Sequence, residues 1–323
     1  HQVVSSGEQA WQEFQQRLSR SNLLVDEIKS IEKHEIGEIN HALEELRLET
    51  RRLELIGVVE GSAPYQEIEL EKRQWDVRYK ELQGQLADLY SELARDQIVV
   101  TMSDGRDVEI PLAKIVDAFQ PNKMSVVEKL AHYGHEVWKF VSGDPREANT
   151  EGGIFPAIFG TVMMVMIMAI LVTPFGVVAA VYLKEYATQG PMIRLIRIAV
   201  NNLAGVPSIV YGVFGLGFFV YFLGGNIDEL FFQASLPAPT FGTPGLMWAS
   251  LTLAILTVPV VIVATEEGLS RIPRNIREGS LALGATKAET LWRTVLPMAA
   301  PAMMTGLILA VARAAGEVAP LMM

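Results

Sequence analysis

Residues 266–301 carry the sequence EEGLSRIPRNIREGSLALGATKAETLWRTVLPMAAP, a polar stretch between two apolar runs, Leu246–Thr265 and Met298–Ala312. The polar stretch holds five cations, namely Arg271, Arg274, Arg277, Lys287 and Arg293. Short loops this basic stay on the cytoplasmic side of a membrane protein. The pattern therefore predicts a membrane protein whose loop 266–297 faces the cytoplasm.

The centre of this loop is predicted to form a short helix. Residues 277–291 are rich in helix formers, Pro273 suits the start of a helix, and Pro297 suits the first turn of the next membrane helix. The predicted helix carries a run of small residues, namely Gly279, Ser280, Ala282, Gly284 and Ala285. Small residues let another surface approach the backbone closely, so we expect a docking element and not a catalytic one.

Composition divides the chain into two unlike parts. Of its 323 residues half are hydrophobic, yet residues 1–150 hold 18 Lys and Arg against 28 Asp and Glu, whereas residues 151–323 hold 9 of each. We expect a soluble domain over 1–150 and a membrane domain over 151–323. There is no cysteine, which excludes disulfides and thiolate metal sites. No P-loop spacing occurs, which excludes ATP binding through that motif.

The first domain begins with two polar, helix-forming stretches separated by the Gly/Pro-containing segment 57–64. Apolar residues recur at heptad spacing in both, as in Ile39, Leu43 and Leu46 and again in Leu82, Leu86 and Leu89. The pattern predicts an antiparallel coiled-coil hairpin over residues 8–97. One alternative is a single long helix, which the Gly/Pro break disfavours. The other is a disordered charged tract, which the heptads disfavour.

Two smaller elements follow. Residues 98–110 alternate apolar and polar around Asp104-Gly105, which predicts a β-hairpin. Residues 125–141 are amphipathic, and this helix is expected to lie flat on the membrane with Tyr133 and Trp138 at headgroup level. His132 and His135 are three residues apart on it, but no third ligand is close, so surface histidines are favoured over a metal pair.

Four membrane segments are predicted in the second domain: Pro156–Leu183, Ala199–Leu223, Leu246–Thr265 and Met298–Ala319. Connections 184–198 and 266–297 hold eight cations together, whereas 224–245 holds none. The positive-inside rule places the first two in the cytoplasm, and 224–245 and residues 1–150 outside. The fold class is thus mainly α. The chain starts without a signal peptide and stops inside an apolar run, so we interpret it as cut at both ends.

Charged residues lie inside the last membrane segment, where a charge costs at least about 2.5–3.5 kcal/mol and must face protein or water. Arg313 and Glu317 are four residues apart. One interpretation is a mutually neutralising pair that staples the helix. The other is that Arg313 lines the path of a small oxyanion and Glu317 holds it in place. Asn201 and Asn202 would add neutral donors at the inner end of their helix or cap that helix.

The loop resembles the EAA loop of the membrane subunits of bacterial ABC importers, in which Glu-Ala-Ala precedes a Gly and a Leu-Pro pair at fixed spacing. Glu278, Gly284, Leu296 and Pro297 fall on this register. Gly279 and Ser280 stand where the family has its two alanines, and Thr294 stands where it has an aliphatic residue. The first two replacements keep small residues small, while the third departs from the pattern.

Residues 151–183, 198–221, 239–245 and 313–321 resemble PstA-type permease subunits of bacterial phosphate ABC importers. The resemblance implies the MetI-like permease fold, with six membrane helices when complete, so that one is expected to be missing on each side and the domain truncated at the C-terminus. Residues 1–150 resemble the periplasmic insertion of long forms. The implied partners are a PstC-like second permease, a PstB-like ATPase dimer that binds ATP and Mg, a periplasmic phosphate-binding protein and membrane lipid, with no nucleic acid.

The function expected from this resemblance is that of a non-catalytic permease subunit translocating inorganic phosphate across the bacterial inner membrane. The residues assigned to the ATPase-docking loop are Glu278, Gly279, Ser280, Ala282, Gly284 and Pro297. Those assigned to the translocation pathway are Arg313, Glu317, Asn201 and Asn202. Two alternatives stay open: a permease for another oxyanion such as sulfate or molybdate, and a membrane sensor with a coiled-coil domain, which would require an output domain that this sequence lacks.

Overall fold

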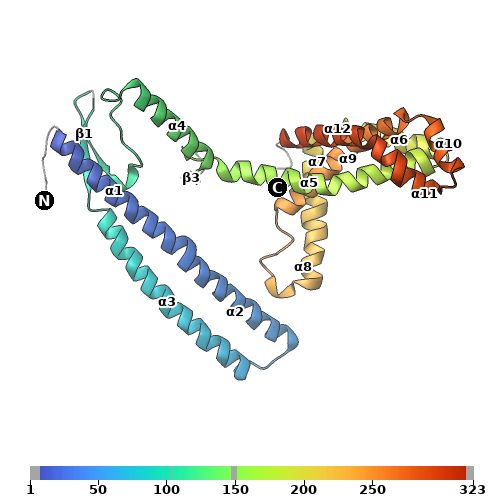
Figure 1. The fold of residues 1–323 in the computed structure, drawn as a ribbon. Coiled ribbons are helices and arrows are strands. Elements are labelled where there is room, and N and C mark those ends of the chain that lie inside the picture. The colour runs from blue at the N-terminus through green and yellow to red at the C-terminus, as the bar shows by residue number, and fades with distance from the viewer. Residues whose placement is uncertain (1–7, 103, 147–150, 318–323) are drawn as a thin grey trace. The chain divides into compact units, whose positions relative to one another are not determined.

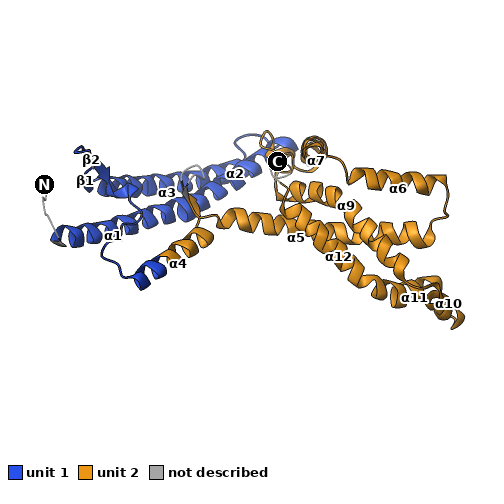
Figure 2. Cartoon of the chain, turned by 90° about the horizontal axis from the view of Figure 1, so that it is seen from above, with its two compact units in different colours: residues 1–132 blue, residues 133–323 orange. Residues whose placement is uncertain are grey.

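The computed structural model describes residues 8–102, 104–146 and 151–317. The chain folds as two compact units, residues 1–132 and 133–323, coloured separately in Figure 2. The division falls inside the helix α4 (Val126–Ser142), earlier in the chain than the boundary expected at residue 150.

The first unit is a long helical hairpin (Figure 1). Its first arm comprises α1 (Glu8–Ser30), a π-helical turn (Ile31–Glu35) and α2 (Ile36–Ile56), and its second arm is α3 (Ala63–Leu93). Gly57, at φ +78°, ends α2 in the left-handed conformation that glycine adopts without strain. The arms run antiparallel, because Arg78 of α3 pairs with Glu35 at 2.8 Å and the Tyr90 hydroxyl donates to Glu32 at 2.8 Å.

The heptad positions face the inside of this hairpin. Its buried core consists of Ile28, Ile31, Ile39, Leu82 and Leu86. Partly buried residues pack around them, namely Ile36, Leu43, Trp75, Tyr79, Leu89 and Leu93. The predicted antiparallel pairing of two helices is present, and supercoiling of these arms stays a prediction.

A small two-stranded sheet and the helix α4 follow the hairpin in the chain. β1 (Gln97–Thr101) pairs antiparallel with β2 (Asp107–Pro111), with Ile98 opposite Ile110. Gly105, at φ +82°, supplies the tight turn between them, as the sequence predicted. After a 3₁₀ turn (Leu112–Lys114), the chain leads to α4.

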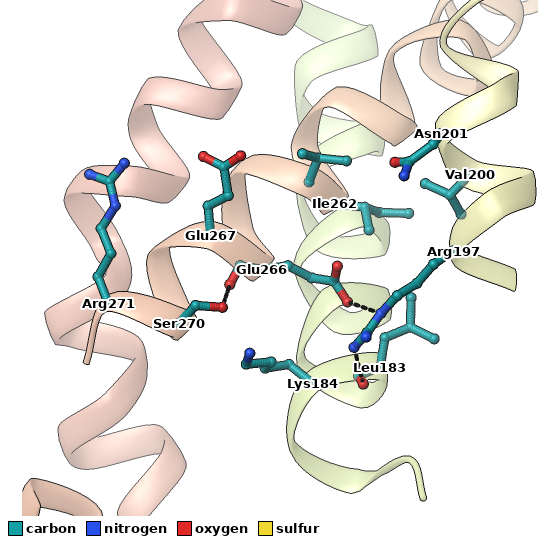
Figure 3. Close-up of a pocket in the computed structure, with 11 residues that line it drawn as sticks. Leu183, Lys184, Arg197, Val200, Asn201, Ile262, Glu266, Glu267, Ser270 and Arg271 are labelled. Carbon is teal, nitrogen blue, oxygen red and sulfur yellow. Dashed lines mark hydrogen bonds and ion pairs between the residues drawn. The ribbon is translucent and has the colours of Figure 1, made fainter. Parts of the chain in front are cut away.

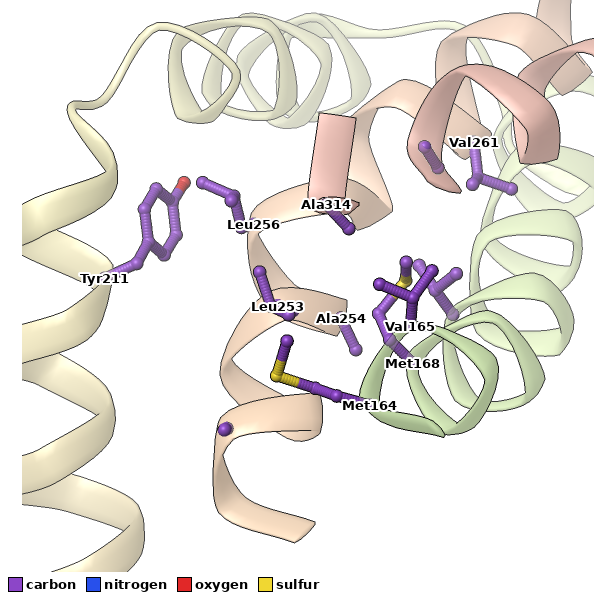
Figure 4. Close-up of a cluster of buried hydrophobic side chains, with 12 residues drawn as sticks. Met164, Val165, Met168, Tyr211, Leu253, Ala254, Leu256, Val261 and Ala314 are labelled. Carbon is purple, nitrogen blue, oxygen red and sulfur yellow. The ribbon is translucent and has the colours of Figure 1, made fainter. Parts of the chain in front are cut away.

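The second unit is built on three apolar helices, α5 (Phe155–Val181), α9 (Leu246–Arg271) and α12 (Leu296–Ala315). Figure 4 shows Met164 and Met168 of α5 directed towards Leu253 and Ala254 of α9. Glycine permits the closest approaches between these helices, since a Cβ on Gly306 would lie 2.5 Å from the Cβ of Ala264.

Four helical segments are long and apolar enough to cross a membrane: Phe155–Tyr186, Ser208–Phe231, Leu246–Arg271 and Lys287–Ala315. The predicted start of the second span at Ala199 is wrong. Residues 191–203 form a separate helix, α6 (Pro191–Leu203), and the span begins with α7 (Ser208–Gly215). Pro207 disfavours helical geometry in the residue before it, which explains the break between them.

The second span continues through a π-helical segment (Leu216–Gly224) into α8 (Gly225–Phe231). The chain after it is held by Asp228, whose side chain is buried and accepts hydrogen bonds from the backbone N–H groups of Phe241 and Gly242, the latter at 2.7 Å. The Trp248 indole N–H donates to the Phe241 carbonyl at 2.7 Å. These bonds tie the connection after α8 to the start of α9.

Candidate functional site

The polar loop, residues 266–297, contains two helices where one was predicted. α10 (Arg274–Ala282) is followed by a turn and then by α11 (Lys287–Thr290), which continues through a π-helical segment (Leu291–Val295) into α12. The single helix expected over 277–291 is therefore wrong. Gly284 breaks it at φ +86°, with the Ala285 N–H bonded to the Ser280 carbonyl, the pattern of a Schellman C-cap.

A sequence signal for this break exists and was missed. Thr286 and Glu289 form a capping box, in which the Thr286 hydroxyl accepts from the Glu289 N–H and the Glu289 carboxylate accepts from the Thr286 N–H at 2.8 Å. A glycine followed by Thr-x-x-Glu marks the end of one helix and the start of the next. The two helices also meet through the Ser280 and Thr290 hydroxyls, 2.9 Å apart.

Arg277 anchors the polar loop to the core. Its guanidinium lies 2.9 Å from the carboxylate of Glu185, which belongs to the π-helical segment (Tyr182–Tyr186) that ends the first span. It also donates to the carbonyls of Leu269 at 2.8 Å and Ile272 at 3.3 Å, at the end of α9. Arg277 therefore connects α10 to the ends of two membrane helices.

A second tether lies beside it. The Lys287 ammonium donates to the backbone carbonyl of Glu185 and lies 4.6 Å from the ring centroid of Tyr186. A buried cluster shared by α9 and the start of the last span contains Leu269, Leu291 and Val295. The loop is thus fixed on its inner side by charge and by packing.

The outer side of the loop is open. Of the residues assigned to docking, Glu278, Gly279, Ala282, Gly284 and Pro297 are exposed, while Ser280 is half-buried by its contact with Thr290. Three large apolar side chains are also exposed there, namely Leu281, Leu283 at 90% and Trp292 at 74%. These apolar residues were not among the predicted site residues, and nothing in their spacing marks them as exposed.

Arg313, a residue of α12, contacts the carboxyl end of α6. Its guanidinium nitrogens donate to the Ala204 carbonyl at 3.4 and 3.5 Å, and its Nε lies 3.6 Å from the Glu317 carboxylate. The Tyr211 hydroxyl donates to the neighbouring Leu203 carbonyl at 2.8 Å. Two side chains therefore satisfy carbonyls that the end of a helix leaves without partners.

Asn201 and Asn202 lie on α6, outside the second span, and both are exposed. Among the described residues, neither side chain hydrogen-bonds Arg313. Asn201 lines a cavity of about 500 Å³ between α6, the end of the first span and α9. In this cavity Arg197 pairs with Glu266 at 3.4 Å and donates to the Leu183 carbonyl at 3.2 Å (Figure 3).

These sites offer charged side chains and exposed contact surfaces. Over the part of the chain that the structure describes, no group of three His, Asp or Glu residues is placed to hold a metal ion. The His132 ring packs at a tilt against Phe119, with centroids 4.3 Å apart. What the arrangement offers is an exposed loop tied to the membrane helices and a set of charges along those helices.

Comparisons with known proteins agree on the membrane part. Residues 152–322 match the family described as binding-protein-dependent transport system inner membrane component. Over 171 residues, the chain is 39% identical to phosphate transport system permease protein PstA 1 of Mycobacterium tuberculosis, covering 53% of this chain and 50% of that protein. It is 30% identical over 173 residues to the probable phosphate transport system permease protein PstA of Methanocaldococcus jannaschii, covering 54% and 55%.

A third relative is the probable ABC transporter permease protein YqgH of Bacillus subtilis, 29% identical over 205 residues, which cover 63% of this chain and 60% of that protein. The chain spans about half the length of the PstA proteins it matches. All four candidate spans lie within the matched residues. The resemblance noted for 151–321 is confirmed, and this chain belongs to the family of inner membrane components of binding-protein-dependent transport systems.

Proposed function

We propose that this chain is a permease subunit of an ATP-driven importer and carries inorganic phosphate across the bacterial inner membrane. The chain itself is not an enzyme in this proposal, because ATP is hydrolysed by a separate partner. The observation that carries the proposal is the polar loop, which combines an exposed small-residue surface with tethers to two membrane helices. The phosphate named for the PstA relatives supports the choice of substrate.

The proposed coupling is mechanical. An ATPase that grips α10 at Glu278, Gly279 and Ala282, and the turn after it at Gly284, moves the loop when it closes on ATP. Arg277 transmits this movement to Glu185 at the end of the first span and to the end of α9. The membrane helices then rock between inward and outward access.

The proposed path for the anion runs along the carboxyl half of α6. Arg313, which pairs with Glu317, contacts the carboxyl end of α6, and Asn201 lines the cavity that also contains Arg197. Arg313 and Arg197 each share their charge with a carboxylate. Such cations suit an anion that passes, and not one that is held tightly. Asn202 would serve as a neutral hydrogen-bond donor near this cavity.

The proposed assembly follows the resemblance. It comprises a second, PstC-like permease, a PstB-like ATPase dimer and a phosphate-binding protein outside the membrane. The excess of Lys and Arg in connections 184–198 and 266–297 supports a cytoplasmic position for the polar loop. By the same rule residues 1–150 lie in the periplasm, as a domain added to the permease.

Two substitutions at Gly279 test the docking role. Gly279 is exposed within α10, and a Cβ there would meet nothing within 4 Å, so both Gly279→Ala and Gly279→Leu should leave the chain folded and gain up to about 1 kcal/mol of helix stability. Alanine matches the residue of the EAA pattern, whereas leucine projects from the surface. We expect Gly279→Ala to retain phosphate uptake and Gly279→Leu to lose both uptake and co-purification of the ATPase.

The measurement is uptake of radiolabelled phosphate by cells that produce the chain together with its partners, with melting temperature in detergent as the folding control. Normal uptake by the well-folded Gly279→Leu variant would refute the docking role. Competition by unlabelled sulfate as strong as that by unlabelled phosphate would refute the choice of substrate while leaving the docking role intact.

A further inference from the structure

Helix α4 carries an apolar stripe that is exposed along its length. Seven residues at helical spacing form this stripe, namely Val126, Val127, Leu130, Tyr133, Val137, Trp138 and Val141. Each of them is exposed, from 40% at Val141 to 76% at Val127, and α4 has no buried residue. An apolar face of this length left in water is unfavourable, so we expect it to be covered by another surface.

The opposite face of α4 is polar and balanced in charge. It carries Glu128, Lys129, His132, His135, Glu136 and Lys139. The helix also begins with its own cap: the Ser125 N–H donates to Glu128 at 2.7 Å, and the Glu128 N–H is bonded to the Ser125 hydroxyl. Hydrogen bonds from the backbone N–H and the side chain of Ser125 to the Glu128 carboxylate lower the pKa of that carboxyl group. The helix is thus amphipathic, with a preformed start and no excess of cations.

The carboxyl end of α4 is joined to the start of the first membrane span by a closed elbow. The N–H groups of Ile154 and Phe155 donate to the carbonyls of Phe140 at 2.9 Å and Gly143 at 3.2 Å. The backbone approach is so close that a Cβ on Gly153 would lie 2.0 Å from the Gly143 carbonyl oxygen. Because both sides of this elbow belong to the second unit, it fixes the end of α4 at the point where α5 begins.

The start of α5 is itself apolar and open, with Ile154, Phe155, Ile158 and Phe159 all exposed. Exposed apolar side chains are therefore present on both sides of the elbow, at the start of a membrane span and along α4. Tyr133 and Trp138 within the stripe are side chains that favour the membrane–water boundary. Phe119, which packs at a tilt against His132, contacts the polar side of the helix and not the stripe.

We propose that α4 is an interfacial anchor, which lies in the surface of the bilayer with its apolar stripe among the acyl chains. The occupant of the stripe is lipid, and the Gly143–Gly153 elbow sets the height at which the helix meets it. Because the polar face has no excess of cations, zwitterionic lipid suffices and anionic lipid is not required. This proposal rests on α5 crossing the membrane and not on the substrate that the chain carries.

The chain contains no cysteine, so a single introduced cysteine gives one labelled position. We would attach a nitroxide at Val137→Cys, in the stripe, and at His135→Cys, on the opposite face, in the full chain reconstituted into phosphatidylcholine vesicles. Collisions with dissolved oxygen and with a water-soluble nickel complex then report depth. We expect the label at 137 about 5–10 Å below the headgroups and the label at 135 in water.

Three results would overturn the proposal. Equal access of the nickel complex to both labels would place the stripe in water. Protection of position 137 from both reagents would mean that a protein, such as a second copy, covers the stripe. A requirement for added phosphatidylglycerol would contradict the argument from charge. Gly153→Ala tests the elbow, and we expect it to shift the label at 137 towards the water, so an unchanged depth would overturn that part.

Discussion

Removing the guanidinium of Arg277 should weaken both the fold and the coupling. The Arg277 and Glu185 side chains are only 20% and 14% exposed, and the pair is 2.9 Å long. Arg277→Met leaves Glu185 with a buried charge and leaves the carbonyls of Leu269 and Ile272 without this donor. Breaking a buried pair costs about 3–5 kcal/mol, and the partial exposure here puts the expected cost near the lower end, about 3 kcal/mol.

The reciprocal change should cost less. Glu185→Gln removes the carboxylate, but Arg277 keeps its two bonds to backbone carbonyls, so we expect a loss of about 1–2 kcal/mol. The double variant no longer contains an unpaired carboxylate. Its cost should therefore fall short of the sum of the single costs by about 1–2 kcal/mol.

Reversible unfolding in mixed detergent micelles, followed by circular dichroism, measures these three costs. Arg277→Lys serves as the control for charge alone, because an ammonium lacks the planar fork that reaches the carboxylate and two carbonyls together. We expect Arg277→Lys to lie between the wild type and Arg277→Met. Additive costs in the double variant would refute the direct pairing of Arg277 with Glu185, and unaltered phosphate uptake in Arg277→Met would refute its part in coupling.

Three further predictions concern single residues. Gly284→Asn should fold almost as well as the wild type, since asparagine tolerates φ > 0. Gly284→Val at φ +86° should cost at least about 1–2 kcal/mol of folding free energy. Equal melting temperatures of these two variants would refute the left-handed turn at Gly284. Asp228→Ala should free the chain after α8 and make residues 232–245 sensitive to protease, with Asp228→Asn in between, and unchanged cleavage would contradict the anchoring role. Arg313→Gln should reduce phosphate uptake while complex assembly continues, and unchanged uptake would favour a purely structural pair with Glu317.

The elements that the sequence predicts well are those governed by local pattern. Heptad spacing indicated the two arms of the hairpin, alternation around Asp104-Gly105 indicated β1 and β2, and apolar length indicated the membrane spans. The second span was misplaced because the largely apolar character of 199–223 outweighed Asn201, Asn202 and Pro207, although the proline decides the local backbone.

The candidate site was predictable only in part. The exposed residues of the polar loop carry the motif themselves, so their place in the sequence is sufficient to find them. The tether could not be predicted, since Arg277 and Glu185 are far apart in the chain and their pairing depends on how α5 and α9 pack. The exposure of Leu283 and Trp292 likewise depends on which side of the loop the core covers.

The bond between Arg313 and the last turn of α6 has an electrostatic consequence. The guanidinium is shared between a backbone carbonyl at a helix terminus and the Glu317 carboxylate. If α6 shifts by a single peptide unit, that carbonyl withdraws and the positive potential around Arg313 rises. The local potential at this charge pair is therefore set in part by the location of a neighbouring helix.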